Sequence, residues 1–189
     1  MGAPKTRPGE PVPLTRTAAR ADADRAVTAL YLAHYRPMVR MAALLVQDLA
    51  VAEEIVQDSF AALHAAWPRL PDADYALPYL RRFMVDRSRS VLRQRVVVDT
   101  PGPRLAPERP GGEAEASIEA ERSAFISALW TLPARQREVV VLRYYADLPL
   151  AEVASATGAS AAAVRAHAAR AMSSLRAELG AADDTGPRE

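Results

Sequence analysis

The chain has 189 residues, of which 50% are hydrophobic and 25% are charged, and its net charge is +1 at pH 7. These values are typical of a globular protein with one medium domain or two small ones, and they argue against a non-specific polycation. There is no cysteine, which excludes disulfide frameworks, thiolate zinc sites and cysteine nucleophiles. Because 40 residues are alanine and only 6% are aromatic, we predict an all-α fold with small cores.

Four prolines and scattered arginines mark the start of the chain. This composition cannot bury enough apolar surface to fold, so residues 1–22 are predicted to form a disordered arm. The N-terminus has no apolar signal core, and the longest strongly apolar run, residues 41–47, is far shorter than the roughly 20 residues that span a bilayer. We therefore expect a cytoplasmic protein with no membrane partner.

A first helical block is predicted over residues 23–97, which contain no glycine. Its first apolar stripe is interrupted at Pro37, where we expect the helix to kink or restart. A second stripe ends at Pro68. A third helix begins near Pro78 and is expected to place Phe83 in the core. The block therefore predicts a domain of three main helices.

Charge is divided unevenly within this block. Residues 41–68 contain four acidic residues and neither lysine nor arginine. Residues 78–95 contain six arginines, and Asp86 is their single acidic neighbour. The domain is therefore expected to have an acidic face on its second helix and a basic face on its third.

A segment rich in helix breakers follows the first block. Residues 100–113 hold four prolines and three glycines, so we predict a flexible linker over residues 98–115. Proline-rich linkers extend by about 3.1 Å per residue, and this one can separate its ends by roughly 40 Å. A second helical block is predicted over residues 116–179, and residues 180–189 are expected to form a disordered tail. The sequence thus predicts two small helical domains joined by a flexible linker.

A helix-turn-helix is predicted in the second block from the spacing of its small and apolar residues. Ala154 lets two helices cross closely, and Gly158 supplies a positive φ in the turn between them. Ser160 can cap the next helix, and Val164 packs that helix onto the first one. Because many αα-hairpins share a glycine turn, a hairpin with no DNA partner is the alternative for this motif alone.

The outward side of the second helix of this motif would contact DNA if the helix enters a major groove. Arg165 and Arg170 can donate to guanine edges or phosphates, while the alanines allow close approach and contact with thymine methyl groups. Arg137 and Arg143, on the preceding helix, can hold the DNA backbone. For each arginine the alternative is a solvated surface charge. The predicted duplex-binding residues are Arg143, Ser160, Ala161, Ala162, Arg165, Ala166, His167, Ala169 and Arg170.

Two stretches, DLAVAEEIVQDSF at residues 48–60 and LPARQREVVVLRYY at residues 132–145, occur in this order, and the second is followed by the helix-turn-helix. Together they resemble bacterial RNA polymerase sigma factors of the extracytoplasmic-function (ECF) type. The first stretch, with Trp67, is similar to the polymerase-binding region 2 of that family, and the second to its promoter-binding region 4. The resemblance covers about residues 26–97 and 117–179.

This resemblance implies a sigma factor that binds core RNA polymerase and directs promoter recognition, DNA opening and transcription initiation. The expected contacts on the polymerase are the β′ clamp helices and the β flap, and an anti-sigma protein is an expected regulator. The alternative is a helix-turn-helix transcriptional regulator that acts without polymerase. For the polymerase contact the candidates are Asp48, Glu53, Glu54, Gln57 and Asp58, although a solvated acidic face would show the same pattern.

The loop over residues 68–77 and the third helix would bind the minus-ten element as an opened single strand, and the second block would bind the minus-thirty-five element. Tyr75 or Tyr79 can stack an unpaired base, although Tyr79 can equally be a core residue, and the arginines can contact phosphates. The candidates for the opened strand are Tyr75, Arg81, Arg82, Asp86, Arg89 and Arg93. The family often has asparagine where Asp86 stands and arginine where His167 stands, so base preferences are expected to differ.

A catalytic function has little support. His34, His64 and His167 are isolated in the sequence, and there is no glycine-rich phosphate loop or cluster with metal-ligand spacing. We therefore predict no catalytic residue, no metal and no cofactor.

Overall fold

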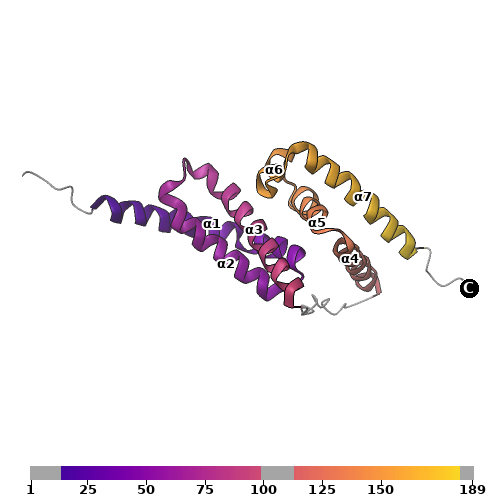
Figure 1. The fold of residues 1–189 in the computed structure, drawn as a ribbon. Helices are drawn as coiled ribbons and strands as arrows, with labels where there is room; N and C mark the ends of the chain where they lie inside the picture. The colour runs from indigo at the N-terminus through magenta and orange to yellow at the C-terminus, as the bar shows by residue number, and fades with distance from the viewer. Residues whose placement is uncertain (1–13, 99–112, 184–189) are drawn as a thin grey trace, which may run out of the picture.

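The computed structural model describes residues 14–98 and 113–183, with side chains over 21–95 and 122–180. The described residues form two groups of helices and no strand, as the composition predicts (Figure 1). The first group is α1 (Leu14–Val46), α2 (Leu49–Ala66), the short turns η1 (Trp67–Arg69) and η2 (Ala73–Tyr75), and α3 (Ala76–Val98). The second is α4 (Glu113–Thr131), α5 (Ala134–Val140), the π-helical turn η3 (Val141–Tyr145), α6 (Leu150–Thr157) and α7 (Ala161–Asp183).

The helices extend further at their ends than the composition predicts. Residues 14–22, expected in the disordered arm, are the start of α1, and residues 98, 113–115 and 180–183, expected in the linker and the tail, are likewise helical. Helix propagation adds one hydrogen bond for each residue it fixes, so a helix held by its packed part continues into neighbouring alanine-rich sequence. The rest of the predicted arm, linker and tail lies outside the described residues, at 1–13, 99–112 and 184–189.

The restart expected at Pro37 does not occur, because α1 runs through this residue. Proline has no N–H, so the helix loses one hydrogen bond to the preceding turn. The residues that follow are among the most buried in the chain: Met38 is 2% exposed, and Ala42 and Leu45 are equally enclosed. Packing of this turn against α2 and α3 holds the helix together across the proline.

The first group packs around the buried faces of its three helices. Ile55 and Leu63 of α2 belong to the same buried cluster as Leu80 and Met84 of α3, and all four side chains are fully buried. Phe83 is only half-buried, contrary to the expectation of a core position, and its ring lies 6.3 Å from that of Tyr79. The apolar stripes of the sequence therefore locate this core except at Phe83 and at Tyr31, a member of the first stripe that is 38% exposed.

The helix-turn-helix is present as predicted. Gly158 ends α6 with φ +67° and ψ 24°, in the left-handed region. The Ser160 Oγ accepts a hydrogen bond from the backbone N–H of Ala163 at 3.1 Å, so it caps α7. Val164 is 1% exposed and packs α7 onto the rest of the second group.

Gly158→Val is expected to destabilise the second group by at least about 1 kcal/mol, because a β-branched residue is strained in the left-handed region. A Cβ at this position would meet no atom within 4 Å, so the cost comes from the backbone and not from a clash. Gly158→Asn is the control, since asparagine tolerates this conformation. Urea unfolding of the three proteins measures the difference, and equal stabilities would contradict the role of the turn.

Candidate nucleic-acid interface

The first half of α7 is an open surface. Arg165 and Arg170 are exposed, and the Nη2 atom of Arg170 lies 3.2 Å from the Nδ1 atom of the half-buried His167. The other exposed positions that were predicted to face DNA are Ser160, Ala161, Ala162, Ala166 and Ala169. A helix that presents two arginines among alanines allows its backbone to approach a duplex closely.

Arg137 on α5 and Arg143 on η3 make contacts within the second group of helices. Arg137 is buried, with its guanidinium carbon 3.8 Å from the centre of the Trp130 ring, and burial lowers its pKa to about 10. The expectation that Arg137 holds the DNA backbone is therefore wrong, because its charge is enclosed. Arg143 is half-buried, and its Nη1 donates to the carbonyl of Leu148 at 2.6 Å, which fixes the turn before α6.

Four of the residues predicted for the opened strand are exposed on η2 and α3: Tyr75, Arg82, Asp86 and Arg93. Tyr75 is 56% exposed, so its ring has an open face for stacking. Arg82 lies 3.9 Å from Asp86 in a loose ion pair. Arg93 donates to the Ser90 Oγ at 2.9 Å. These contacts are local to α3 and leave the four side chains at the surface.

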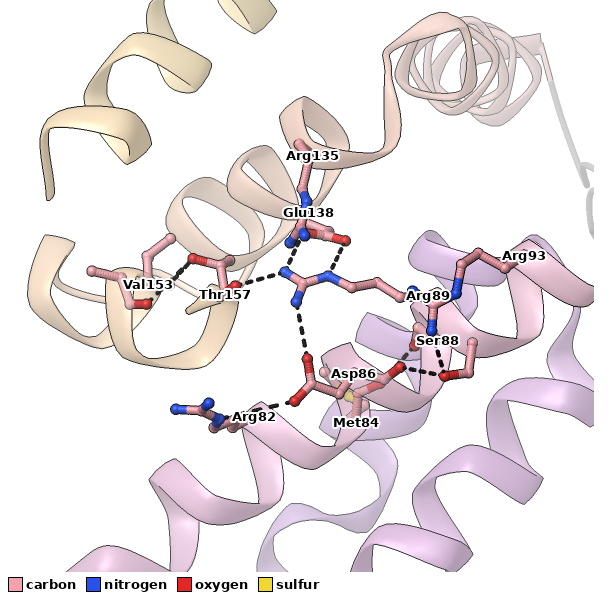
Figure 2. Close-up of polar contacts among 12 residues, drawn as sticks. Arg82, Met84, Asp86, Ser88, Arg89, Arg93, Arg135, Glu138, Val153 and Thr157 are labelled. Atoms are coloured by element: carbon pink, nitrogen blue, oxygen red, sulfur yellow. Dashed lines mark hydrogen bonds and ion pairs between the residues drawn. The ribbon is translucent and has the colours of Figure 1, made fainter. Parts of the chain in front are cut away.

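Arg89 lies instead between the two groups of helices (Figure 2). Its Nε and Nη2 atoms donate to the two carboxylate oxygens of Glu138 on α5, each at 2.7 Å. Nη2 also donates to the carbonyl of Thr157 at 2.9 Å, and Nη1 donates to Asp86 at 2.9 Å. Burial disfavours the charge, but the hydrogen bonds and charges of Glu138 and Asp86 outweigh it, so the pKa of Arg89 is raised.

A second ion pair joins the groups beside the first. The Nη1 atom of Arg81 on α3 donates to the carboxylate of Glu152 on α6. Arg135 adds a longer contact of 3.4 Å to Glu138 from within α5. The structure therefore brings two arginines predicted for DNA onto carboxylates of the second group, which the sequence did not identify as functional residues.

The acidic surface of α2 is formed by four of its five predicted residues. Glu53, Glu54, Gln57 and Asp58 are exposed, and Asp58 accepts from Arg87 at 3.1 Å. These side chains lie on the solvent side of α2, opposite the buried stripe. The surface can therefore meet a positively charged partner.

The prediction that Asp48 contacts the polymerase is wrong, because its carboxylate is part of the fold. It is 6% exposed, and its Oδ1 caps α2 by accepting from the backbone N–H of Val51 at 3.1 Å. Its Oδ2 accepts from Arg95 at 2.7 Å, and Arg95 also donates to the carbonyl of Val46 at 2.8 Å. The carboxylate thus joins the α1–α2 turn to the end of α3 and is not available to a partner.

Asp48→Ala is expected to destabilise the protein by about 1–3 kcal/mol, because the change removes a helix cap and leaves Arg95 without its carboxylate. Asp48→Asn is the matched control, since asparagine caps helices as well as aspartate does but forms no ion pair. Denaturant unfolding separates the two contributions. An alanine variant as stable as the wild type would contradict this assignment.

Two further features bear on function. Among the described residues, no three histidine or acidic side chains come together as ligands for a metal ion. None of the described helices combines the length and the apolar character that a membrane span requires.

Comparison with known proteins places the helix-turn-helix in a family. Residues 128–177 match the family model "Sigma-70, region 4". The chain is 34% identical over 146 residues to the RNA polymerase sigma-E factor of Streptomyces coelicolor, covering 77% of this chain and 81% of the relative. It is 31% identical over 184 residues to the RNA polymerase sigma factor NccH of Alcaligenes xylosoxydans xylosoxydans, covering 92% and 97%.

Solved structures share the fold. The structure of CnrH in complex with the cytosolic domain of CnrY matches with a TM-score of 0.64 and 24% identity, covering 87% of this chain and 96% of that one. The sigma factor RpoE of Bartonella quintana, solved with the anti-sigma factor NepR, matches with a TM-score of 0.61 and 19% identity, covering 81% and 96%. The relatives favour the sigma-factor interpretation over a regulator that acts without polymerase. The chain belongs to the RNA polymerase sigma factors, and it is of the extracytoplasmic-function type.

Proposed function

We propose that this sigma factor docks on core RNA polymerase through the acidic surface of α2 and directs it to promoters through α7, η2 and α3. One arrangement carries the proposal. The chain exposes the acidic surface on the first group of helices and an arginine-bearing surface on the second. One surface suits a basic protein partner, and the other suits a duplex.

The docking surface consists of Glu53, Glu54, Gln57 and Asp58. No lysine or arginine lies between Met41 and Pro68 in the sequence, so the negative potential of α2 is not neutralised by cations of the same segment. Complementary charges steer association and fix the orientation of two partners. The proposed receptor is the β′ clamp helices, and the β flap is a further contact.

Promoter contacts are proposed at both groups. On the second group, Arg165 and Arg170 contact base edges or phosphates of the minus-thirty-five duplex, with His167 and the exposed alanines beside them. On the first group, Tyr75 stacks an unpaired base of the minus-ten strand, and Arg82 and Arg93 contact its phosphates. The carboxylate of Asp86 accepts hydrogen bonds only, which favours bases that donate.

Strand opening in this proposal is driven by binding energy and not by a chemical step. Extruding a base from the stack costs a few kcal/mol, which stacking on an aromatic ring and contacts to phosphates can offset. Sigma factors of this type are regulators without an enzymatic activity of their own. The proposal adds an anti-sigma protein as a partner and places the chain in the cytoplasm with the polymerase.

Capture of core RNA polymerase tests the proposal. The immobilised full chain is expected to retain core polymerase from a purified preparation, and the complex is expected to bind promoter DNA more tightly than the free chain does. A folded chain that binds a duplex but never retains polymerase would contradict the proposal. The circular dichroism spectrum of the same preparation shows whether the chain is folded.

A further inference from the structure

His167 and Arg170 are neighbours on α7. They are three positions apart, so one turn of the helix brings their side chains together. The Nη2 atom of Arg170 lies 3.2 Å from the Nδ1 atom of His167, which is within hydrogen-bonding distance. The contact links an arginine proposed to bind DNA to the imidazole one turn nearer the start of the helix.

The chemistry of this hydrogen bond fixes the state of the imidazole. A guanidinium has five N–H donors and no acceptor, so the Nδ1 atom of His167 must accept. The ring is therefore neutral and carries its proton on Nε2. A protonated imidazole donates from both nitrogens, and it would set a donor and a second positive charge against the guanidinium. The hydrogen bond can thus exist only while His167 is neutral.

The charged groups around His167 come from α5 as well as from α7. A surface hollow of about 130 Å³ is lined by His167, by Arg135 and Glu138 of α5, and by uncharged residues. The Glu138 carboxylate already accepts from Arg89 and from Arg135 (Figure 2). A proton on the ring would therefore meet the guanidiniums of Arg135 and Arg170 and one carboxylate that is already paired. The hollow has room for water, so the ring can exchange its proton with solvent.

We propose that His167 is a positioning residue for Arg170 and makes recognition of the minus-thirty-five duplex depend on pH. The neutral ring holds the Arg170 guanidinium toward the first half of α7, the part of a recognition helix that reaches base edges. The protonated ring releases the guanidinium and becomes a further cation at the duplex. This inference rests on the proposed function, because it assumes that Arg170 contacts DNA.

The sign of the pH dependence follows from linkage. The phosphates of a bound duplex are negative, and a nearby opposite charge favours the charged form of an imidazole. DNA binding and protonation of His167 therefore strengthen each other, since coupling between two binding events is reciprocal. Histidine side chains change charge between about pH 5 and pH 8, so DNA affinity is expected to rise as the pH falls through this range.

Nitrogen-15 NMR of the imidazole rings tests the contact in the full chain. The chain has three histidines, so His167→Gln identifies the signals of His167 by their loss. At about pH 8 the ring is expected to be in the Nε2–H form. Arg170→Ala is expected to move the titration midpoint of His167 to higher pH, because it removes a donor to the neutral ring and a positive charge. Arg176→Ala, an exposed arginine further along α7, is expected to leave the midpoint unchanged.

Binding of the holoenzyme to promoter DNA is the second readout. For the wild type, the slope of log affinity against log salt is expected to be steeper at about pH 5.5 than at about pH 8, by about 0.9 for one further phosphate contact. Glutamine offers a carbonyl acceptor to Arg170 and does not titrate, so the His167→Gln holoenzyme is expected to have one slope at both pH values. The affinity of the wild type relative to this variant is expected to rise as the pH falls, by no more than about tenfold per pH unit because one proton is taken up.

Two further variants separate the charge of His167 from general effects of pH. His167→Arg is charged at both pH values and is expected to show the steeper slope throughout. His64→Gln removes a histidine of α2, whose Nε2 atom lies 2.6 Å from Asp24, and is expected to keep the wild-type pH dependence. Because all holoenzymes share the same core polymerase, differences between them report the substituted side chain.

The outcomes separate this inference from the proposed function. A neutral His167 ring protonated on Nδ1, or a titration midpoint that Arg170→Ala does not move, would overturn the contact. Equal salt slopes for the wild type at both pH values would overturn the pH dependence, even if Arg170→Ala weakens promoter binding. If Arg170→Ala leaves promoter binding unchanged, the proposed function is wrong at Arg170 and this inference fails with it.

Discussion

Replacing both Glu53 and Glu54 with lysine is expected to weaken binding of core RNA polymerase by at least about tenfold, or about 1.4 kcal/mol. Both side chains are exposed on a part of α2 that has no cation of its own. The change turns two attractive charges into repulsive ones at the surface proposed to meet the β′ clamp helices. Because these residues lie outside the core, helix content and stability are expected to stay unchanged.

The control for this prediction is a charge reversal far from α2. Glu178→Lys changes one exposed carboxylate near the end of α7 and is compared with Glu54→Lys alone, so that the change in net charge is the same. Fluorescence anisotropy of labelled chain against core polymerase, at two salt concentrations, measures both. Equal affinities for the two variants would mean that α2 is not the docking surface.

Replacing Arg165 and Arg170 with alanine is expected to abolish discrimination among minus-thirty-five sequences or to weaken DNA binding uniformly, depending on what each side chain contacts. Each lost base contact costs about 1–3 kcal/mol at one base position. Each lost phosphate contact lowers the slope of log affinity against log salt by about 0.9. The holoenzyme bound to promoter DNA is the species to measure, because the proposed function places these contacts in the complex with core polymerase.

Arg176→Ala is the matched control on the same helix, since Arg176 is exposed but lies beyond the first half of α7. It is expected to change neither base preference nor salt slope. If the Arg165 and Arg170 variants behave like the Arg176 variant, α7 does not contact the promoter through these two arginines.

Much of the local structure could be predicted because it follows from nearby residues. The helix-turn-helix is predicted from Gly158, which ends α6 in the left-handed region, and from Ser160, which caps α7. Both residues act on backbone groups within a few positions of themselves. Asp48 also carries a local signal, an acidic residue directly before an apolar helix, which is typical of an N-cap. Because its charge also fits the acidic surface, the pattern alone does not distinguish a helix cap from a docking residue.

The contacts that depend on distant parts of the chain could not be predicted. Glu138 precedes an apolar run and is four positions before the buried Leu142, so helical periodicity places its carboxylate on the inward face. That pattern indicates a paired charge but does not name the partner. Arg89 is 49 residues away and on another group of helices, and no pattern in the sequence joins the two.

The continuity of α1 through Pro37 also depends on tertiary contacts. The sequence shows only that proline removes one hydrogen bond from the helix. The helix continues because Met38 and the residues after it are buried against α2 and α3. Tertiary packing can outweigh a single local cost of this size.

Transcription reconstituted from purified core RNA polymerase, the full chain and a pool of genomic promoter fragments is the most direct test. Discrete transcription start sites are expected to appear only when the folded chain and the core enzyme are both present, with shared sequences near the minus-ten and minus-thirty-five positions. A folded chain that leaves core polymerase without any such start sites would contradict the assignment of promoter-directing activity.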